Sequence, residues 1–478
     1  MICVGLLLLL AASCDALCAN QWTWTDLERR LPTSVTNIGP EAPFNAEQAK
    51  GRVVLFRDSN AWCPFSERIW LALEVKNADY ITCLVDDDYR QPPLAKGSLP
   101  RIKWRDGTTM DGSDPVAMLE RIEQEWPHEP LFFPKVSVSV DVVRDSFQRW
   151  EGILPRFTLP SATAPYIFAC KLQKAGSFAV EECEIGTLVP KYKYEVCLEE
   201  MCVSCQSRPR DLAHSRAVLP AEIGIAFTAL LLTVSLIPHS DEVLGEYETG
   251  PFIAGADVSA ADIYWAPFLE RLCAHIPLVH GSRLKARGGR YDALTEWYEA
   301  METLVPAYSC RVKGRMATWQ RVLVEEHPEI DIASEVETSL PVEADLPSAR
   351  DGFDAARVWA SYAEARPHVA RSPAEEAAAQ IVRRRATLVP AVADACGFSS
   401  DASDATLAEV CAALLAIAER TNEEGGADKI DSAASEAESG RAELSEEACS
   451  AVKFLNAGGF AVPRDLGVIP AEALRALL

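Results

Sequence analysis

Basic residues are scarce in this 478-residue chain. Lys and Arg together number 46 against 70 Asp and Glu, which gives a formal net charge of −24. Proteins that bind nucleic acid neutralise its phosphates with Lys and Arg, so this balance argues against nucleic acid as a partner. The chain is longer than a domain with a single hydrophobic core usually is, so its length predicts several domains.

A regular cysteine framework and a complete metal-binding motif are also lacking. The 15 cysteines follow no repeated spacing, and those scattered along apolar stretches are typical of small core residues. Cys202 and Cys205 have half of a zinc-ribbon spacing, but no second pair or histidine couple follows at the proper distance. We therefore expect no metal.

A hydrophobic run of full membrane-spanning length is missing too. Residues 221–238 (AEIGIAFTALLLTVSLIP) are apolar, but the stretch is short for a span and contains Glu222. A buried helix of a bundle fits better than membrane insertion. Residues 1–16 (MICVGLLLLLAASCDA) are shorter still, and small residues at Cys14 and Ala16 follow the leucine run as in a signal peptide.

The signal peptide predicts entry into the secretory pathway. Two other destinations stay open: a plastid reached through the endoplasmic reticulum, if the source is an alga, and the cytoplasm, if the first residues are a gene-model artefact. Residues 17–50 form an N-terminal extension before the first organised unit.

That unit begins with a buried strand in GRVVLFRD (51–58), followed by a helix from Pro64 with apolar residues at helical spacing. A second strand is predicted at YITCLVD (80–86), a hairpin in 99–110, and a helix at DPVAMLERIEQEW (114–126), where a proline again occupies the first helical position. The order βαβ followed by ββα predicts a thioredoxin-like domain over residues 51–130.

Cys63 lies at or just before the first helix of this domain. Free N–H groups and the positive end of a helix dipole favour a thiolate, so the position predicts a lowered pKa and a nucleophilic sulfur. Three residues later, where a dithiol oxidoreductase has its resolving cysteine, the chain has Ser66. We therefore predict a monothiol whose mixed disulfide must be resolved by an external thiol; inert packing is the alternative.

Two further segments are candidates for ligand contacts. In a thioredoxin-like unit the Leu99-Pro100 bond is expected to be cis, which turns the backbone groups of the preceding residue toward a ligand beside the sheet. At the start of the next helix, Ser113 can hold a ligand carboxylate and an acidic side chain can pair with an ammonium. Plain N-capping is the alternative role of Asp114.

Three stretches together resemble the glutathione S-transferase superfamily: WCPFSERIWLALE (62–74), LPRIKWRDGTTMDGSDPVAMLE (99–120) and GPFIAGADVSAADIYWAPFLERL (250–272). The cysteine-type classes (omega, lambda and dehydroascorbate reductase) are the most similar in motif. In the third stretch, Ser259 and Asp262 also have the spacing of a capping box.

The resemblance implies that Cys63 is the catalytic thiol, that Phe65, Leu99 and Pro100 contribute to the glutathione site, and that Ser113 and Asp114 hold the γ-glutamyl end. The chain departs from the family's Glu-Ser pair, because it has Gly112-Ser113-Asp114, and the acidic partner could be Asp111 or Asp114. Glutathione would be a co-substrate.

The rest of the chain is predicted to be helical. The superfamily's all-α domain is expected over 136–325, with an insertion at about 158–218 that is either genuine or a gene-model artefact. A linker at 326–350 and an acidic helical extension at 351–478 follow, the latter including one amphipathic helix over 374–395.

The fold expected is therefore an α/β thioredoxin-like domain, an all-α glutathione-transferase domain and an additional α-helical extension. The activity expected is glutathione-dependent thiol transfer or reduction, with a small disulfide, a glutathione conjugate or dehydroascorbate as substrate. The alternative is a non-catalytic binding or scaffold protein of the same fold. A homodimer and a protein partner for the extension are further expectations.

Overall fold

The computed structural model describes residues 22–31, 46–47, 49–58, 61, 63–85, 99–134, 142–145, 250–280, 292–316, 318–319, 353–423, 444–459 and 466–478. Predictions for the signal peptide at 1–16, the insertion at 158–218, the apolar stretch at 221–238 and the linker at 326–350 lie outside these residues. Among the described helices, none is long and apolar enough to cross a membrane.

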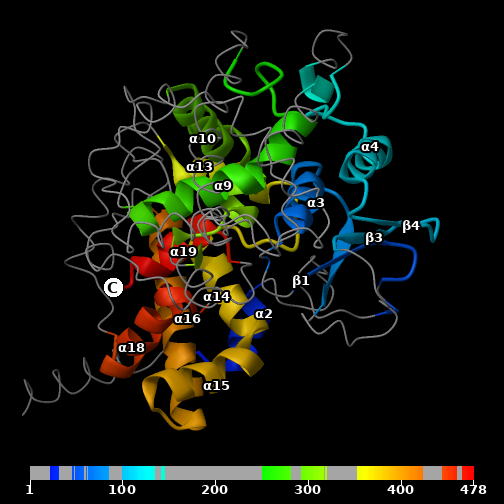
Figure 1. The fold of residues 1–478 in the computed structure, drawn as a ribbon. Helices are drawn as coiled ribbons and strands as arrows, with labels where there is room; N and C mark the ends of the chain where they lie inside the picture. The colour runs from blue at the N-terminus through cyan, green and yellow to red at the C-terminus, as the bar shows by residue number, and fades with distance from the viewer. Residues whose placement is uncertain are drawn as a thin grey trace, which may run out of the picture.

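A small mixed sheet forms the N-terminal domain (Figure 1). Its strands are β1 (Val53–Asp58), β2 (Tyr80–Val85), β3 (Arg101–Lys103) and β4 (Thr109–Asp111), in the order β2-β1-β3-β4. β1 pairs parallel to β2 and antiparallel to β3, and β3 pairs antiparallel to β4. With helices α3 (Pro64–Val75) and α4 (Pro115–Glu125), this confirms the predicted βαβ-ββα order. Both helices have proline in their first turn, where its missing N–H loses no hydrogen bond.

The second domain contributes α9 (Ala260–His280), α10 (Asp292–Leu304) and the π-helical turn η3 (Tyr308–Val312). Asp262 organises the start of α9: its carboxylate accepts hydrogen bonds from the backbone N–H and the hydroxyl of Ser259, at 2.9 and 2.7 Å. It also accepts from the N–H of Ile253 and the indole of Trp297. The predicted pairing of Ser259 with Asp262 is confirmed. Burial outweighs the four donors and raises the pKa of Asp262.

One hydrophobic core joins the sheet domain to the second domain. It contains Val53, Leu55 and Ile69 from the first and Trp265 and Trp297 from the second, all fully buried. Because the core is continuous, α3 lies against α9 with no layer of solvent between them (Figure 1).

The C-terminal residues form a helical module of α13 (Ala355–Ala363), α14 (Pro373–Arg383), α15 (Arg385–Cys396), α16 (Ser400–Glu423), α18 (Glu446–Phe454), η7 (Leu455–Gly459) and α19 (Val468–Arg475). The single helix predicted over 374–395 is wrong. The chain bends at Arg384, and the break lets α14 and α15 both pack against α16.

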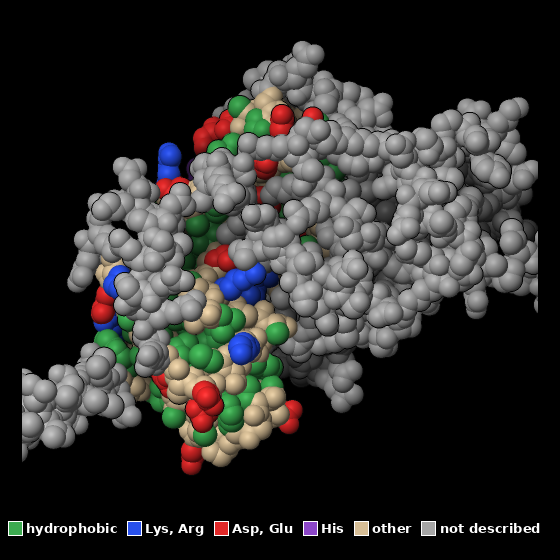
Figure 2. Space-filling model, turned by 90° about the vertical axis from the view of Figure 1, so that its left-hand side faces the viewer, with side chains coloured by type: hydrophobic (Ala, Val, Ile, Leu, Met, Phe, Trp, Pro, Cys, Tyr) green, Lys and Arg blue, Asp and Glu red, His purple; other side chains and the backbone are tan. Residues whose placement is uncertain are grey.

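Helix α2 (Trp24–Arg30), from the N-terminal extension, packs into this C-terminal module. Leu27 and Leu31 are buried with residues of α14 and α16, and the indole of Trp24 donates to Asp404 at 2.9 Å. Helix α2 and the C-terminal module therefore share one hydrophobic core. On the described part of the face in Figure 2, charged side chains stand singly or in small groups.

The module is attached to the rest of the protein through Glu74, at the end of α3. The hydroxyls of Tyr80 and Tyr362 donate to its two carboxylate oxygens, at 2.6 and 2.9 Å, and Arg366 donates to its backbone carbonyl. Gly467, just before α19, meets η3 so closely that a Cβ there would lie 2.1 Å from the carbonyl oxygen of Cys310. At this contact the two backbones approach closely and the side chains are buried, as in the interior of a single domain.

Candidate functional site

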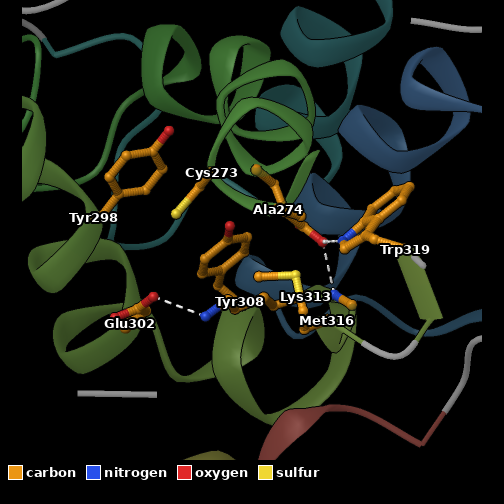
Figure 3. Close-up of a pocket in the computed structure, with 10 residues that line it drawn as sticks. Cys273, Ala274, Tyr298, Glu302, Tyr308, Lys313, Met316 and Trp319 are labelled. Atoms are coloured by element: carbon orange, nitrogen blue, oxygen red, sulfur yellow. Dashed lines mark hydrogen bonds and ion pairs between the residues drawn. The ribbon is translucent and has the colours of Figure 1, made fainter. Parts of the chain in front are cut away.

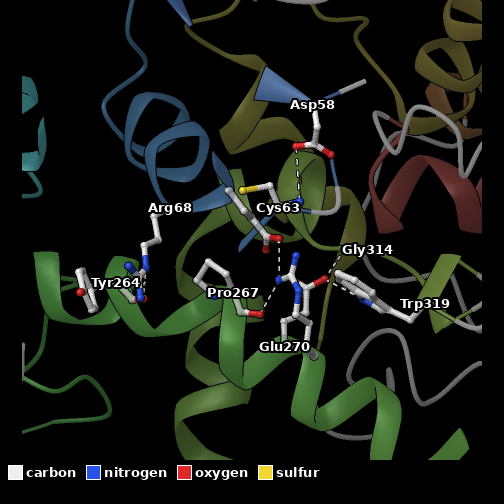
Figure 4. A network of polar contacts seen from close by, with 10 residues as sticks. Asp58, Cys63, Arg68, Tyr264, Pro267, Glu270, Gly314 and Trp319 are labelled. Atoms are coloured by element: carbon white, nitrogen blue, oxygen red, sulfur yellow. Dashed lines mark hydrogen bonds and ion pairs between the residues drawn. The ribbon is translucent and has the colours of Figure 1, made fainter. Parts of the chain in front are cut away.

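Cys63 occupies the N-cap of α3, directly after the loop that leaves β1 (Figure 4). Its carbonyl accepts the first helical hydrogen bond, from Glu67, and its N–H donates to Oδ1 of Asp58, the last residue of β1, at 3.4 Å. The side chain is half-buried. The strand, the loop and the helix therefore hold the sulfur at the end of the sheet, as the sequence predicted.

The electrostatic setting of Cys63 is opposite to the one predicted. Burial raises the pKa of the thiol, and the negative charge of Asp58 raises it further; the hydroxyl and N–H of Ser66 and the N–H of Phe65 lower it by less. The prediction of a lowered pKa was wrong, because it considered the helix N-terminus and left out the burial of the sulfur and a carboxylate on the preceding strand. Without a bound ligand, this site favours the thiol over the thiolate.

Leu99 and Pro100 lie at the same end of the sheet as Cys63. The bond between them is cis, as predicted. β3 begins at Arg101 and runs antiparallel to β1 with Phe56 opposite Arg101. The Leu99-Pro100 segment that leads into β3 therefore lies at the end of the sheet where β1 ends and the chain continues to Cys63.

Gly112 lies between β4 and α4 and contacts the Leu99-Pro100 loop. A Cβ at position 112 would lie 2.8 Å from Cδ of Pro100 and 2.9 Å from the carbonyl oxygen of Leu99, both closer than real Cβ atoms approach. Only glycine lets the two loops meet. The contact places Ser113 next to the Leu99-Pro100 loop, so three of the predicted site segments gather at one end of the sheet.

The polar residues around Ser113 are already engaged with one another. The Ser113 N–H donates to Oδ1 of Asp111 at 3.0 Å, and the side chain and the N–H of Ser113 together, the side chain first, lower the pKa of Asp111. Asp114 caps α4 by accepting from the N–H of Ala117 at 2.9 Å. The N-capping role considered for Asp114 is confirmed, and a role of Asp111 or Asp114 toward a ligand ammonium stays a prediction.

Phe65 is 46% exposed. Its ring packs edge-on against Phe268 of α9, with centroids 5.9 Å apart. The guanidinium of Arg68, itself buried, lies over the rings of Tyr264 and Phe268 and donates to the Tyr264 carbonyl at 2.8 Å. Part of the Phe65 ring therefore packs against buried residues of α9 and α3, and the rest is exposed.

Two buried polar contacts fix the Cys63 helix to the helical domain, and sequence reasoning missed both. Glu67 forms an ion pair with Arg271 of α9 at 2.9 Å, and Arg68 donates to the carbonyl of Tyr264 of α9 at 2.8 Å (Figure 4). Charged residues inside the apolar pattern of α3 were the available signal, because Glu67 and Arg68 lie on a helix that is otherwise buried. Among the described residues, no cluster of His, Cys, Asp and Glu could hold a metal ion.

Comparison with known proteins gives one family match. Residues 232–300 match the family model described as "Glutathione S-transferase, C-terminal domain", and they include α9 and the first part of α10. No curated protein sequence matches the chain. This segment is therefore similar to the helical domain of glutathione S-transferases.

Similar solved structures include the dehydroascorbate reductase of Chlamydomonas reinhardtii, with 18% identity, a TM-score of 0.34, and coverage of 58% of this chain and 98% of that one. Glutathione transferase Omega 3C of Trametes versicolor has 17% identity and a TM-score of 0.35, with coverage of 59% and 95%.

Proposed function

We propose that this protein is a glutathione-dependent thiol transferase or reductase, of the cysteine type, in which Cys63 is the nucleophile. The observation that carries the proposal is the placement of Cys63: it is the N-cap of a helix that follows a strand, beside a cis Leu99-Pro100 loop. The family match at 232–300 supports the glutathione-transferase assignment for the adjoining helical domain.

The proposed reaction has two disulfide exchanges. The Cys63 thiolate attacks the glutathione sulfur of a glutathionyl disulfide, forms a Cys63–glutathione disulfide and releases the substrate thiolate, which takes up a proton. The thiolate of a second glutathione then attacks the glutathione sulfur of that adduct, releasing glutathione disulfide and Cys63 thiolate. An external thiol is needed because Ser66 occupies the place of a resolving cysteine.

Leu99, Pro100, Phe65, Ser113 and Asp114 are the residues we propose for glutathione. The backbone of Leu99 would pair with the cysteinyl unit, and Ser113 would bind the γ-glutamyl carboxylate. Dehydroascorbate is a second substrate that the same thiolate could reduce.

The raised pKa of Cys63 favours a second candidate, a binding protein of the same fold in which the thiol is inert. The two differ in a direct test, the glutathione-dependent reduction of hydroxyethyl disulfide by the full chain. We expect turnover, abolished in Cys63→Ser and retained in Cys396→Ser, which removes another half-buried thiol far along the sequence.

Mass spectrometry of the wild type after exposure to glutathione disulfide should show one adduct on Cys63. Absence of turnover and of the adduct in a folded wild type would favour the binding protein. Turnover that survives Cys63→Ser would contradict the assignment of the nucleophile.

A further inference from the structure

One buried hydroxyl beside the Cys63 site is left without a regular hydrogen bond. Buried polar side chains usually have partners, and in the pocket between α9, α10 and residues 308–319 Lys313 donates to Glu302 at 2.7 Å (Figure 3). Ser66, in the first turn of α3, differs: it is 1% exposed, and its hydroxyl oxygen has no hydrogen-bond partner among the described residues. Such a group lowers stability, and a role in the reaction is one reason for a protein to keep it.

The position of Ser66 in the helix shows what its hydroxyl lies against. Cys63 is the N-cap of α3, and Ser66 is the third residue of the helix. Side chains at these two positions meet in this protein: the hydroxyl of Thr23, the N-cap of α2, donates to Asp26 at 2.5 Å, and the start of α9 has the same contact at 2.7 Å. The hydroxyl of Ser66 is therefore adjacent to the sulfur of Cys63.

The effect on the sulfur agrees with this geometry. With Cys63 as a neutral thiol, the Ser66 hydroxyl forms no regular hydrogen bond to Sγ. Burial, and then Asp58, raise the pKa of Cys63, and the Ser66 hydroxyl is foremost among the groups that lower it. The hydroxyl therefore favours the thiolate, and a thiolate is an acceptor that would satisfy the hydroxyl with a charge-assisted bond.

We propose that the Ser66 hydroxyl is a catalytic group of the thiol-transfer reaction, donating a hydrogen bond to Sγ of Cys63 whenever this sulfur is a thiolate. The inference rests on the proposed function. In the first exchange Sγ attacks as a thiolate, and in the second it leaves as a thiolate when the incoming glutathione forms the new disulfide. Ser66 keeps its proton throughout. Because a thiolate of lower pKa leaves faster, the bond assists the second exchange directly.

A substitution at Ser66 isolates the hydroxyl, because the charges around the sulfur stay in place. The charged side chains described around this helix start are Arg57 and Asp58 of β1, Glu67 and Arg68 of α3, and Glu270 and Arg271 of α9 (Figure 4). Ser66→Ala changes none of them, and alanine is a better helix former than serine.

The test follows alkylation of the full chain by iodoacetamide against pH, read by mass spectrometry on the peptide that contains Cys63. Ser66→Ala should move the half-maximal rate upward by about one pH unit, opposite in direction to Asp58→Asn, because a hydrogen bond to a charged sulfur is lost. Reduction of the Cys63–glutathione adduct by excess glutathione should slow several-fold in the same variant.

Ser403→Ala is the matched control. It removes another buried hydroxyl that has no hydrogen-bond partner among the described residues, in α16 of the C-terminal module. The alkylation profile and the reduction of the adduct should both stay as in the wild type.

Urea unfolding separates this role from a structural one. The hydroxyl has no partner in the thiol state, so Ser66→Ala should unfold at the same urea concentration as the wild type or at a higher one. A lower midpoint would show that the hydroxyl supports the fold, and it would overturn the proposal, as would an unchanged alkylation profile. The alkylation measurement does not depend on turnover. A wild type without turnover contradicts the proposed function, whereas turnover with an unchanged profile in Ser66→Ala contradicts only the role of Ser66.

Discussion

Substituting Gly112 by alanine would test whether the two loops at the end of the sheet form one site. The new Cβ would lie 2.8 Å from the ring of Pro100 and 2.9 Å from the carbonyl oxygen of Leu99, so both neighbours must move. Overpacking of this kind costs about 1–3 kcal/mol. Alanine also restricts the unfolded chain, which offsets about 0.4–1 kcal/mol. We expect a net loss of about 1–2 kcal/mol.

The same displacement should weaken glutathione binding. Moving Leu99 would weaken the backbone hydrogen bond that we propose to the cysteinyl unit, and one such bond is worth about 1 kcal/mol, or about fivefold in affinity. The assay is the KM for glutathione in the hydroxyethyl disulfide reaction, with the unfolding midpoint measured in parallel. We expect a KM several-fold above the wild-type value.

Gly107→Ala is the matched control for this variant. Gly107 lies in the β3–β4 hairpin with φ of +85°, and a Cβ there would meet nothing within 4 Å. Alanine would be strained in that conformation and would lower stability, but it would not push on Leu99. If Gly112→Ala has the KM and the unfolding midpoint of the wild type, the two loops do not form the glutathione site in the way argued here.

Three other substitutions test the contacts of the Cys63 helix. Asp58→Asn removes the charge that raises the pKa of Cys63 while keeping an oxygen for its N–H, so alkylation by iodoacetamide should reach half its maximal rate at lower pH; an unchanged profile would contradict the role of Asp58. Ser66→Cys should replace the glutathione adduct by an intramolecular disulfide, seen by mass spectrometry as the loss of two hydrogens; persistence of the adduct alone would refute this. Arg366→Met leaves the buried Glu74 without its cation and should cost about 3–5 kcal/mol in urea unfolding, whereas the exposed Arg371→Met should cost little.

The local structure of the N-terminal domain, and of the start of α9 in the second domain, could be predicted because its signals are local. Apolar runs, prolines at two helix starts and the spacing of Ser259 and Asp262 each concern residues a few positions apart, and the structure confirms them. The same holds for the position of Cys63 at the end of a strand and the start of a helix.

What could not be predicted depends on contacts between distant residues. Glu67 and Arg271 are 204 positions apart, and Trp24 and Asp404 are 380 apart. The spacing of apolar residues along the sequence gives no information about such distant pairs. The direction of the pKa shift of Cys63 was predicted wrongly for a related reason: only the fold determines that the sulfur is buried and that the carboxylate of Asp58, which is near in sequence, lies beside the N–H of Cys63. Helical spacing likewise did not reveal the bend at Arg384, since both segments are good helices and the break serves their packing on α16.

Buried contacts hold the C-terminal module to α3, the helix that begins after Cys63. These contacts determine which experiment can distinguish an enzyme from a binding protein. α3 is held near its start by Asp58 and by the Glu67–Arg271 ion pair, and at its end by Glu74, which binds Tyr362 and Arg366 of the module. Deleting the module would take Tyr362 and Arg366 away from Glu74 and would expose to water the apolar residues Val75, Ala307 and Cys310, which pack against the module; exposing such surface is destabilising. A truncated chain would therefore lose activity through α3 whether or not the module contacts a partner. Point variants of Cys63 in the full chain are the test that distinguishes an enzyme from a scaffold.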